Sequence, residues 1–264
     1  MAPTQFLHRP DGDIAYDDTL GQGRVVVCVP GMGDLRQSNR ILVPLLRDTG
    51  YRVITVDLRG HGESSTAFTD FRASAVGGDL VALIDHLDIR NAIVLGNSMA
   101  AGSAVWAAAQ RPERVAALLL TGPVIRDIPI NPIVRTMLNI ALWRPWGAVL
   151  WEKFYKMLYK SNPPADLDTY AKTLSRNLRE HGRLEALQAM MRASKADCEA
   201  RIGEVRANTL VLMGNLDPDF TDPAQEAQHV AKVLKGRVQM VEGAGHYPHI
   251  EYPALVVRAL QEIE

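Results

Sequence analysis

The amino-acid sequence predicts an α/β fold with a doubly wound, mostly parallel sheet. Several short apolar runs lie along the chain, and helical patterns separate most of them. The runs do not alternate between apolar and polar residues, which is typical of strands that helices cover on both faces. Strands that alternate with helices are the pattern of a doubly wound sheet. The predicted strands are Val25–Val29, Val53–Val56, Ala92–Leu95, Ala116–Leu120, Leu210–Met213 and Val238–Val241.

The segments beside these strands predict further elements. Apolar residues at positions 76, 80, 83, 84 and 87 share one face of a helix. The segment Ala100–Ala109 is so rich in alanine that we expect a helix packed closely under the sheet. At the N-terminus, Gln5–Leu7 and Ile14–Asp17 predict an antiparallel hairpin through the turn Arg9-Pro10-Asp11-Gly12.

The stretch from residue 123 to residue 204 breaks the alternation of strand and helix. Its pattern is helical throughout, with breaks at prolines, and it carries Trp143, Trp146 and Trp151. An all-helical segment inside an α/β chain is most simply a cap or lid. We therefore expect a core domain of residues 1–122 and 205–264, with a helical cap or lid at 123–204.

Composition narrows the class of protein. The chain has 264 residues, of which 47% are hydrophobic and 22% charged, as in ordinary globular proteins. A net charge of −1 argues against a dedicated binder of nucleic acid or anionic membranes. The N-terminus shows no apolar secretion signal and no run has the length of a membrane span, so a cytoplasmic protein is expected. Cys28, inside an apolar run, is expected to be a buried free thiol.

The strongest local motif is Gly96-Asn97-Ser98-Met99-Ala100, between a predicted buried strand and the alanine-rich helix. A nucleophile elbow needs this context, because its turn is strained and small residues must flank the serine. Ala100 stands where the G-x-S-x-G pattern ends in glycine, so a positive φ there would be strained. Ser98 is the candidate nucleophile.

A second motif, Gly243-Ala244-Gly245-His246-Tyr247-Pro248-His249, follows the last predicted strand. A catalytic base belongs on a loop beyond the carboxyl end of a strand. His246 directly follows the glycine-rich turn and is the candidate base, while His249 is expected to pack or cap. The two histidines do not predict a metal site, because no third ligand with matching spacing lies nearby.

A third motif, Gly214-Asn215-Leu216-Asp217-Pro218-Asp219, follows the strand that ends at Met213. A carboxylate here can accept a hydrogen bond from the imidazole of the base and fix its tautomer. Asp217 is the candidate, and Asp219 and Asp127 are its rivals. The chain order Ser98, Asp217, His246 favours Asp217, because it is the order expected for the elbow fold.

A fourth motif, Pro30-Gly31-Met32-Gly33-Asp34, follows the first parallel strand. Such a loop can donate a backbone N–H to an oxyanion, and we expect the N–H groups of Met32 and Met99 to do so. The glycines of this loop, with Asp57 at the end of the next strand, also superficially match the G-x-G-x-x-G fingerprint of dinucleotide-binding proteins. Arg36, however, stands where that fingerprint has its third glycine. The turn Asp57–Ser64 is expected to brace the sheet, and His61 within it is not the expected base.

Together these motifs resemble the α/β-hydrolase superfamily. The segments PGMGD, DLRGHGES, GNSMA, MGNLDPD and GAGHYPH occur in that family's order along the chain. The resemblance implies an eight-stranded sheet, a helical cap inserted after the sixth strand, and no cofactor. Pro30 departs from the usual His-Gly start of the oxyanion loop and Ala100 from the usual glycine of the elbow. Neither departure removes a triad residue or a backbone donor.

The resemblance favours the broad esterase-like group, so the first hypothesis is a serine hydrolase that cleaves a carboxylic ester or thioester. The apolar cap suggests that the substrate is an apolar or aromatic small molecule. GNSM is also similar to the elbow of meta-cleavage carbon–carbon hydrolases, so hydrolysis of a vinylogous diketone is a second hypothesis. Tyr247-Pro248 after His246 departs from the Trp of those enzymes and favours an esterase. A slow ligand-sensing protein is a third hypothesis. The expected partner is a small-molecule substrate, and both a monomer and a homodimer remain open.

Overall fold

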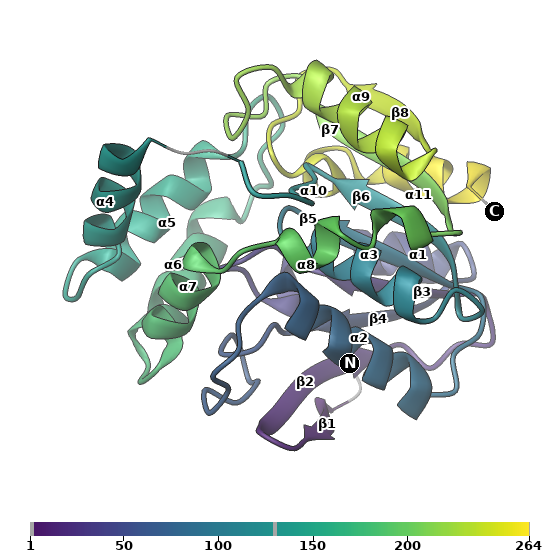
Figure 1. Cartoon of the computed structure of the whole chain (residues 1–264), viewed down its shortest axis with the longest axis horizontal. Coiled ribbons are helices and arrows are strands. Elements are labelled where there is room, and N and C mark those ends of the chain that lie inside the picture. The colour runs from purple at the N-terminus through teal and green to yellow at the C-terminus, as the bar shows by residue number, and fades with distance from the viewer. Residues whose placement is uncertain (1–2, 129–130, 264) are drawn as a thin grey trace.

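In the computed structural model, which describes residues 3–128 and 131–263, eight strands form a single sheet (Figure 1). The strands are β1 (Gln5–Arg9), β2 (Gly12–Asp18), β3 (Val25–Val29), β4 (Arg52–Val56), β5 (Ala92–Asn97), β6 (Val115–Thr121), β7 (Asn208–Gly214) and β8 (Arg237–Val241). Their order across the sheet is β1-β2-β4-β3-β5-β6-β7-β8. The pairs β1–β2 and β2–β4 are antiparallel, and the other pairs are parallel. The predicted doubly wound, mostly parallel sheet is confirmed.

The predicted N-terminal hairpin is also present. Arg9 pairs with Gly12 across a turn made of Pro10 and Asp11, and Gln5 pairs with Tyr16 at the open end. Proline and aspartate favour such a turn because proline fixes φ and aspartate tolerates tight backbone geometry. The hairpin extends the parallel part of the sheet at the β4 edge.

Helices cover both faces of the sheet, and the buried strands explain why. Val25, Val27 and Val29 of β3 pack on one side, while Val26 and Cys28 pack on the other. Because side chains alternate along a strand, a continuous apolar run supplies two cores. Cys28 is fully buried, as predicted. The helices outside residues 123–204 are α1 (Leu42–Asp48), α2 (Ala73–His86), α3 (Ala100–Gln110), α9 (Pro223–Leu234), α10 (Pro248–Glu251) and α11 (Pro253–Glu262), with the 3-10 helix η1 (Arg36–Arg40).

Residues 123–204, called the helical insertion below, connect β6 to β7, and the regular elements in their described part are all helices joined by loops. These are α4 (Pro132–Ala141), α5 (Gly147–Met157), α6 (Leu167–Arg179), α7 (Arg183–Arg192), α8 (Ala196–Glu199) and the 3-10 helix η2 (Ile202–Glu204). Figure 1 shows α4 to α7 grouped on the left of the molecule, beside the sheet. No helix in the described ranges is both long and apolar enough to cross a membrane.

The turn Asp57–Ser64 braces the sheet through buried ion pairs. Asp57 pairs with the guanidinium of Arg36 and also accepts a hydrogen bond from the Arg36 backbone N–H at 2.8 Å. Arg59 makes a bidentate pair with Asp79 of α2. Because each buried charge has a partner, the turn is a rigid support. Arg36, at the place of the third fingerprint glycine, is committed to this support.

Candidate active site

Ser98 lies in the sharp turn between β5 and α3. Its backbone φ is +55°, a left-handed conformation that costs free energy for a residue with a Cβ atom. The Ser98 N–H donates to the carbonyl of Thr121 at 3.0 Å, and the Ser98 carbonyl accepts from the N–H groups of two further residues. The surrounding fold therefore imposes the strained turn, as a nucleophile elbow requires.

The flanking residues show where small side chains matter. A Cβ atom at Gly96 would lie 2.7 Å from the carbonyl oxygen of Ala100, so the strand and helix meet too closely for a side chain there. Among the described residues, Ala100 is not one of those with a positive φ. Its side chain is fully buried. Alanine thus fits the last position of the motif without backbone strain, and the strained residue is Ser98 itself.

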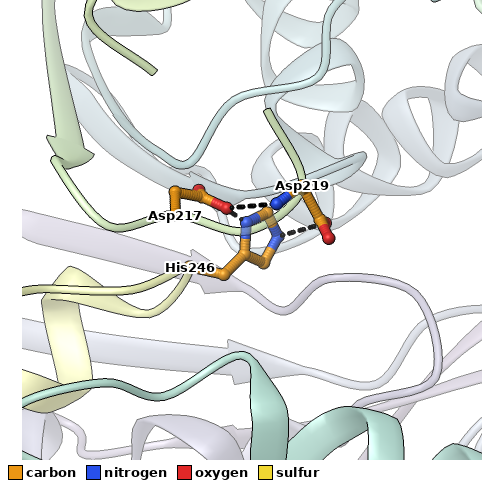
Figure 2. Close-up of side chains that lie close together, drawn as sticks. All are labelled: Asp217, Asp219 and His246. Atoms are coloured by element: carbon orange, nitrogen blue, oxygen red, sulfur yellow. Dashed lines mark hydrogen bonds and ion pairs between the residues drawn. The ribbon is translucent and has the colours of Figure 1, made fainter. Parts of the chain in front are cut away.

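Asp217 and His246 form a buried pair at the carboxyl ends of β7 and β8 (Figure 2). The Nδ1 atom of His246 lies 2.8 Å from Oδ2 of Asp217, and both residues are 2% exposed. With Nδ1 donating to the carboxylate, Nε2 becomes the nitrogen that is free to take a proton. This is the geometry that an acid-oriented general base needs.

Asp219 lies at the other nitrogen of the same ring. Its Oδ2 atom is 3.5 Å from Nε2 of His246, so the imidazole sits between two carboxylates (Figure 2). Nε2 thus faces Asp219, and across residues 3–128 and 131–263 no hydrogen bond of the Ser98 hydroxyl is found. Burial alone would lower the pKa of His246, but the charges of Asp217 and Asp219 outweigh burial and raise it to about 9.

This arrangement predicts a pH dependence. A general base must be neutral, so activity should rise with pH as His246 loses its proton near pH 9. Asp219→Asn removes one of the two charges that favour the imidazolium, so the acidic limb of the kcat/KM profile should move down by about one pH unit. Activity near pH 7 should increase in this variant. Kinetics from pH 6 to 10 measure both effects.

Asp11→Asn is the matched control for this substitution, because Asp11 is an exposed residue of the N-terminal turn. The control should leave the pH profile unchanged. An acidic limb that stays in place in Asp219→Asn would show that Asp219 does not act on the base.

Two other candidates from the sequence, Asp127 for the orienting acid and His249 for the base, make different contacts. Asp127 accepts a hydrogen bond from the backbone N–H of Lys195 at 2.9 Å, within the helical insertion. His249 is buried, and its Nδ1 atom lies 3.1 Å from Oγ1 of Thr121. Burial, together with the charge of His246, lowers the pKa of His249 to about 3. His249 is therefore a neutral packing residue.

The loop Gly31–Asp34, which the sequence predicts to supply an oxyanion donor and which is called the oxyanion loop below, lies against the elbow. A Cβ atom at Gly31 would come within 3.1 Å of the Ser98 Cβ atom, so glycine allows this close approach. The N–H of Gly33 donates to Nε2 of His61 at 3.1 Å, while His61 Nδ1 lies 2.8 Å from the Arg59 carbonyl. Burial lowers the pKa of His61 to about 4, which keeps the ring neutral and able to accept that bond. His61 thus supports the loop and is not placed as a base.

Asn97 and Glu251 were not recognised from the sequence. The Asn97 amide donates to the carbonyls of Thr121 and His246, at 3.0 and 3.2 Å, and so ties the elbow to the base loop. Glu251 is fully buried and accepts from the backbone N–H of Gly245 at 2.6 Å. Asn97 stands inside the elbow motif, which was a usable signal. Glu251 stands five residues after His246, and no sequence signal marks that position.

The same centre is the place where a cation would find ligands. Atoms of Asp217, Asp219 and His246 that can bind a metal lie within 4.8 Å of one another. One of these contacts, however, is the hydrogen bond from the imidazole to Asp217, which already uses Nδ1. The donor set suits the storage and transfer of a proton, and we assign no metal to it.

Comparison with known proteins places this geometry in a family. A family model described as alpha/beta hydrolase fold matches residues 24–253. The chain belongs to the α/β-hydrolase fold family. A curated α/β-hydrolase relative, the 2-hydroxy-6-oxononadienedioate/2-hydroxy-6-oxononatrienedioate hydrolase 1 of Pseudomonas putida, is 28% identical and aligns over 94% of this chain and 92% of its own.

Solved structures agree with the α/β-hydrolase assignment. A bromoperoxidase from Bacillus anthracis superposes with a TM-score of 0.85 at 19% identity, covering 99% of both chains. A thermophilic esterase from Thermogutta terrifontis gives a TM-score of 0.80 at 26% identity, covering 99% of this chain and 97% of its own. The first likeness shows the fold alone. The Pseudomonas putida hydrolase and the Thermogutta terrifontis esterase, at 28% and 26% identity, support a hydrolase.

Proposed function

We propose that this protein is a serine hydrolase that cleaves a carboxylic ester or thioester of an uncharged apolar or aromatic small molecule. The observation that carries the proposal is the buried Asp217–His246 pair, tied through Asn97 to the turn that holds Ser98 at φ +55°. The proposed roles are nucleophile for Ser98, general base for His246 and orienting acid for Asp217. Backbone N–H groups of Met32 and Met99 are the proposed oxyanion donors.

In the proposed reaction, the Ser98 oxygen attacks the acyl carbon while its proton passes to Nε2 of His246. The oxyanion forms between the two backbone donors, which stabilise it most in the transition state. The C–O or C–S bond then breaks, His246 returns the proton to the leaving group, and an acyl-enzyme remains. Water, deprotonated by His246, attacks the acyl carbon, the bond from that carbon to the Ser98 oxygen breaks, and His246 returns the proton to Ser98 as the acid leaves.

Charge near the site supports an uncharged substrate. The imidazole of His246 lies between the carboxylates of Asp217 and Asp219. In the neutral form that a general base needs, the ring adds no positive charge, so a carboxylated substrate beside it would meet the negative charge of the two carboxylates. The Met32 side chain also packs against an apolar cluster of the helical insertion that contains Trp151. Both features favour an apolar acyl group.

Carbon–carbon hydrolysis is the second candidate, favoured by the Pseudomonas putida relative that aligns over nearly the whole chain. The substrate in that relative's name is a dioate, which carries two carboxylates. The negative centre around Asp219 is poorly suited to such a dianion, and for that reason we place the ester first.

The test combines labelling with a substrate panel. A fluorophosphonate should modify Ser98 and leave the fully buried Ser103 of α3 unmodified, as peptide mass spectrometry would show. Nitrophenyl esters of increasing chain length, a matching acyl thioester and a ring-cleavage dienedioate should then be compared. We expect steady turnover of neutral esters and little of the dienedioate. Turnover of the dienedioate alone would favour the carbon–carbon hydrolase, and a single burst without turnover would favour a sensor.

A further inference from the structure

Side chains of the helical insertion hold the oxyanion loop from outside. Trp151 of α5 donates from Nε1 to the carbonyl of Gly33 at 3.0 Å. Tyr170 of α6 donates to Oδ1 of Asp34 at 2.6 Å, and Tyr155 of α5 donates to Oδ2 at 3.2 Å. All of these side chains are buried, with Asp34 and Tyr155 completely so. The loop that follows β3 is therefore bonded to helices more than a hundred residues away.

The hydrogen bonds of the loop do not use the Met32 N–H. Asp34 N–H donates to the carbonyl of Gly31 at 3.2 Å, and Gly33 has φ +72°, as the third residue of a type II turn requires. The Gly33 N–H is used by His61 and the Gly33 carbonyl by Trp151. Among the described residues, the Met32 N–H has no intramolecular acceptor. The contacts from His61 and Trp151 thus fix the two peptide planes that follow the proposed oxyanion donor, and the Asp34 N–H holds the donor's own peptide through the Gly31 carbonyl.

Burying the Asp34 carboxyl costs free energy, which argues that the direction of the hydrogen bonds to it matters. Burial raises the pKa of the Asp34 carboxyl to about 6, although hydrogen bonds from Tyr170, Leu35 and Tyr155 act against the rise. A buried carboxylate is expensive unless its lone pairs are satisfied, and bonds to a charged acceptor are short and directional. An apolar residue would join the loop to the insertion with less penalty, but it would not fix the orientation of the turn.

The segment of the helical insertion that follows α5 holds the loop of the proposed base. The N–H of His246 donates to the carbonyl of Leu158, just after α5, at 2.9 Å. The ring of Tyr247 stacks on that of Tyr159 with centroids 4.9 Å apart. Insertion residues therefore touch both sides of the site, the oxyanion loop and the base loop.

We propose that Trp151, Tyr155 and Tyr170 are positioning residues for the oxyanion hole, acting through Gly33 and Asp34 to aim the Met32 N–H at the developing oxyanion. This inference rests on the proposed serine hydrolase function. Loss of a whole oxyanion donor costs about 10²- to 10³-fold in kcat, so misdirecting one costs less. Since ground-state binding does not use the oxyanion contact, kcat falls while KM stays nearly constant.

The experiment uses conservative variants of the full chain. Tyr170→Phe removes only the hydroxyl that bonds Asp34, and the double variant Tyr155→Phe/Tyr170→Phe removes both. Tyr16→Phe is the matched control, because Tyr16 is also buried and its hydroxyl bonds Gln5 in the distant N-terminal hairpin. We expect kcat on an activated ester to fall about 10-fold in the single variant and up to about 100-fold in the double variant. KM should change less than about threefold in each variant, and the control should match the wild type.

A second readout separates positioning from general support. A trifluoromethyl ketone forms a tetrahedral adduct with the nucleophile, so its affinity should weaken in parallel with kcat/KM. If the double variant does not fold, Tyr170→Phe and Trp151→Phe, each with a thermal unfolding midpoint near that of Tyr16→Phe, carry the test. Unchanged kcat and unchanged ketone affinity in the folded variants, beside an active wild type, overturn this inference alone. A wild type without Ser98-dependent turnover overturns the proposed function as well.

Discussion

Ser98→Ala is expected to lower kcat for the best ester by about 10⁶-fold, the loss that follows removal of a triad serine in other hydrolases. The expectation follows from the placement of Ser98 in the strained turn between β5 and α3, where its hydroxyl is the proposed nucleophile. Residual turnover should show no burst and no covalent adduct. Steady-state kinetics and intact-protein mass spectrometry measure the two effects.

Ser103→Ala is the matched control, because it makes the same chemical change in the buried face of α3. It should retain activity. Ser98→Gly adds a stability test, since glycine adopts φ +55° without the strain of a Cβ atom. It should be as inactive as Ser98→Ala but more stable by about 1 kcal/mol in urea unfolding. Ester turnover that survives in Ser98→Ala would refute the proposed function.

Asp217→Asn is expected to lower kcat by about 10⁴-fold with little change in KM. The Asp217 carboxylate accepts from Nδ1 of His246 at 2.8 Å and so leaves Nε2 unprotonated for the nucleophile. An asparagine amide can donate to Nδ1 and so select the opposite tautomer, in which Nε2 carries the proton and cannot act as a base. Measuring kcat on the high-pH plateau removes the effect of His246 titration from the comparison.

Asp219→Asn is the matched control for Asp217→Asn, because both substitutions remove one negative charge beside the same ring. On the high-pH plateau, Asp219→Asn should stay within a few-fold of the wild type. The reverse result, a large loss in Asp219→Asn and a small one in Asp217→Asn, would assign the orienting role to Asp219.

The sheet was predictable because its strands are buried on both faces. Runs such as Val25–Val29 and Leu210–Met213 contain no polar residue, and each supplies side chains to the cores on both sides of the sheet. The pairing of Asp217 with His246 was predictable for a related reason. Parallel strands end at one edge of the sheet, so residues just after neighbouring strands such as β7 and β8 lie close together there.

The rest depends on contacts that no local pattern records. Asp34 accepts from Tyr170 across a separation of 136 residues, and neither residue stands in a motif that signals the other. Asp217 and Asp219 stand on the same turn, and the sequence of that turn does not say which side of the imidazole each carboxylate faces. Only the folded turn shows that one carboxylate faces Nδ1 and the other Nε2. Side-chain orientation within a turn is set by the tertiary structure.

The hydrogen bonds from α5 and α6 to the oxyanion loop bear on protein engineering. Exchange of the whole insertion with that of another hydrolase is a common route to new specificity, but here the exchange would remove Trp151, Tyr155 and Tyr170 together. A chimera would need equivalents of all three to keep its turnover. By contrast, α4 has no buried side chain among its described residues. Libraries aimed at new substrates should therefore randomise α4 and keep α5 and α6 unchanged.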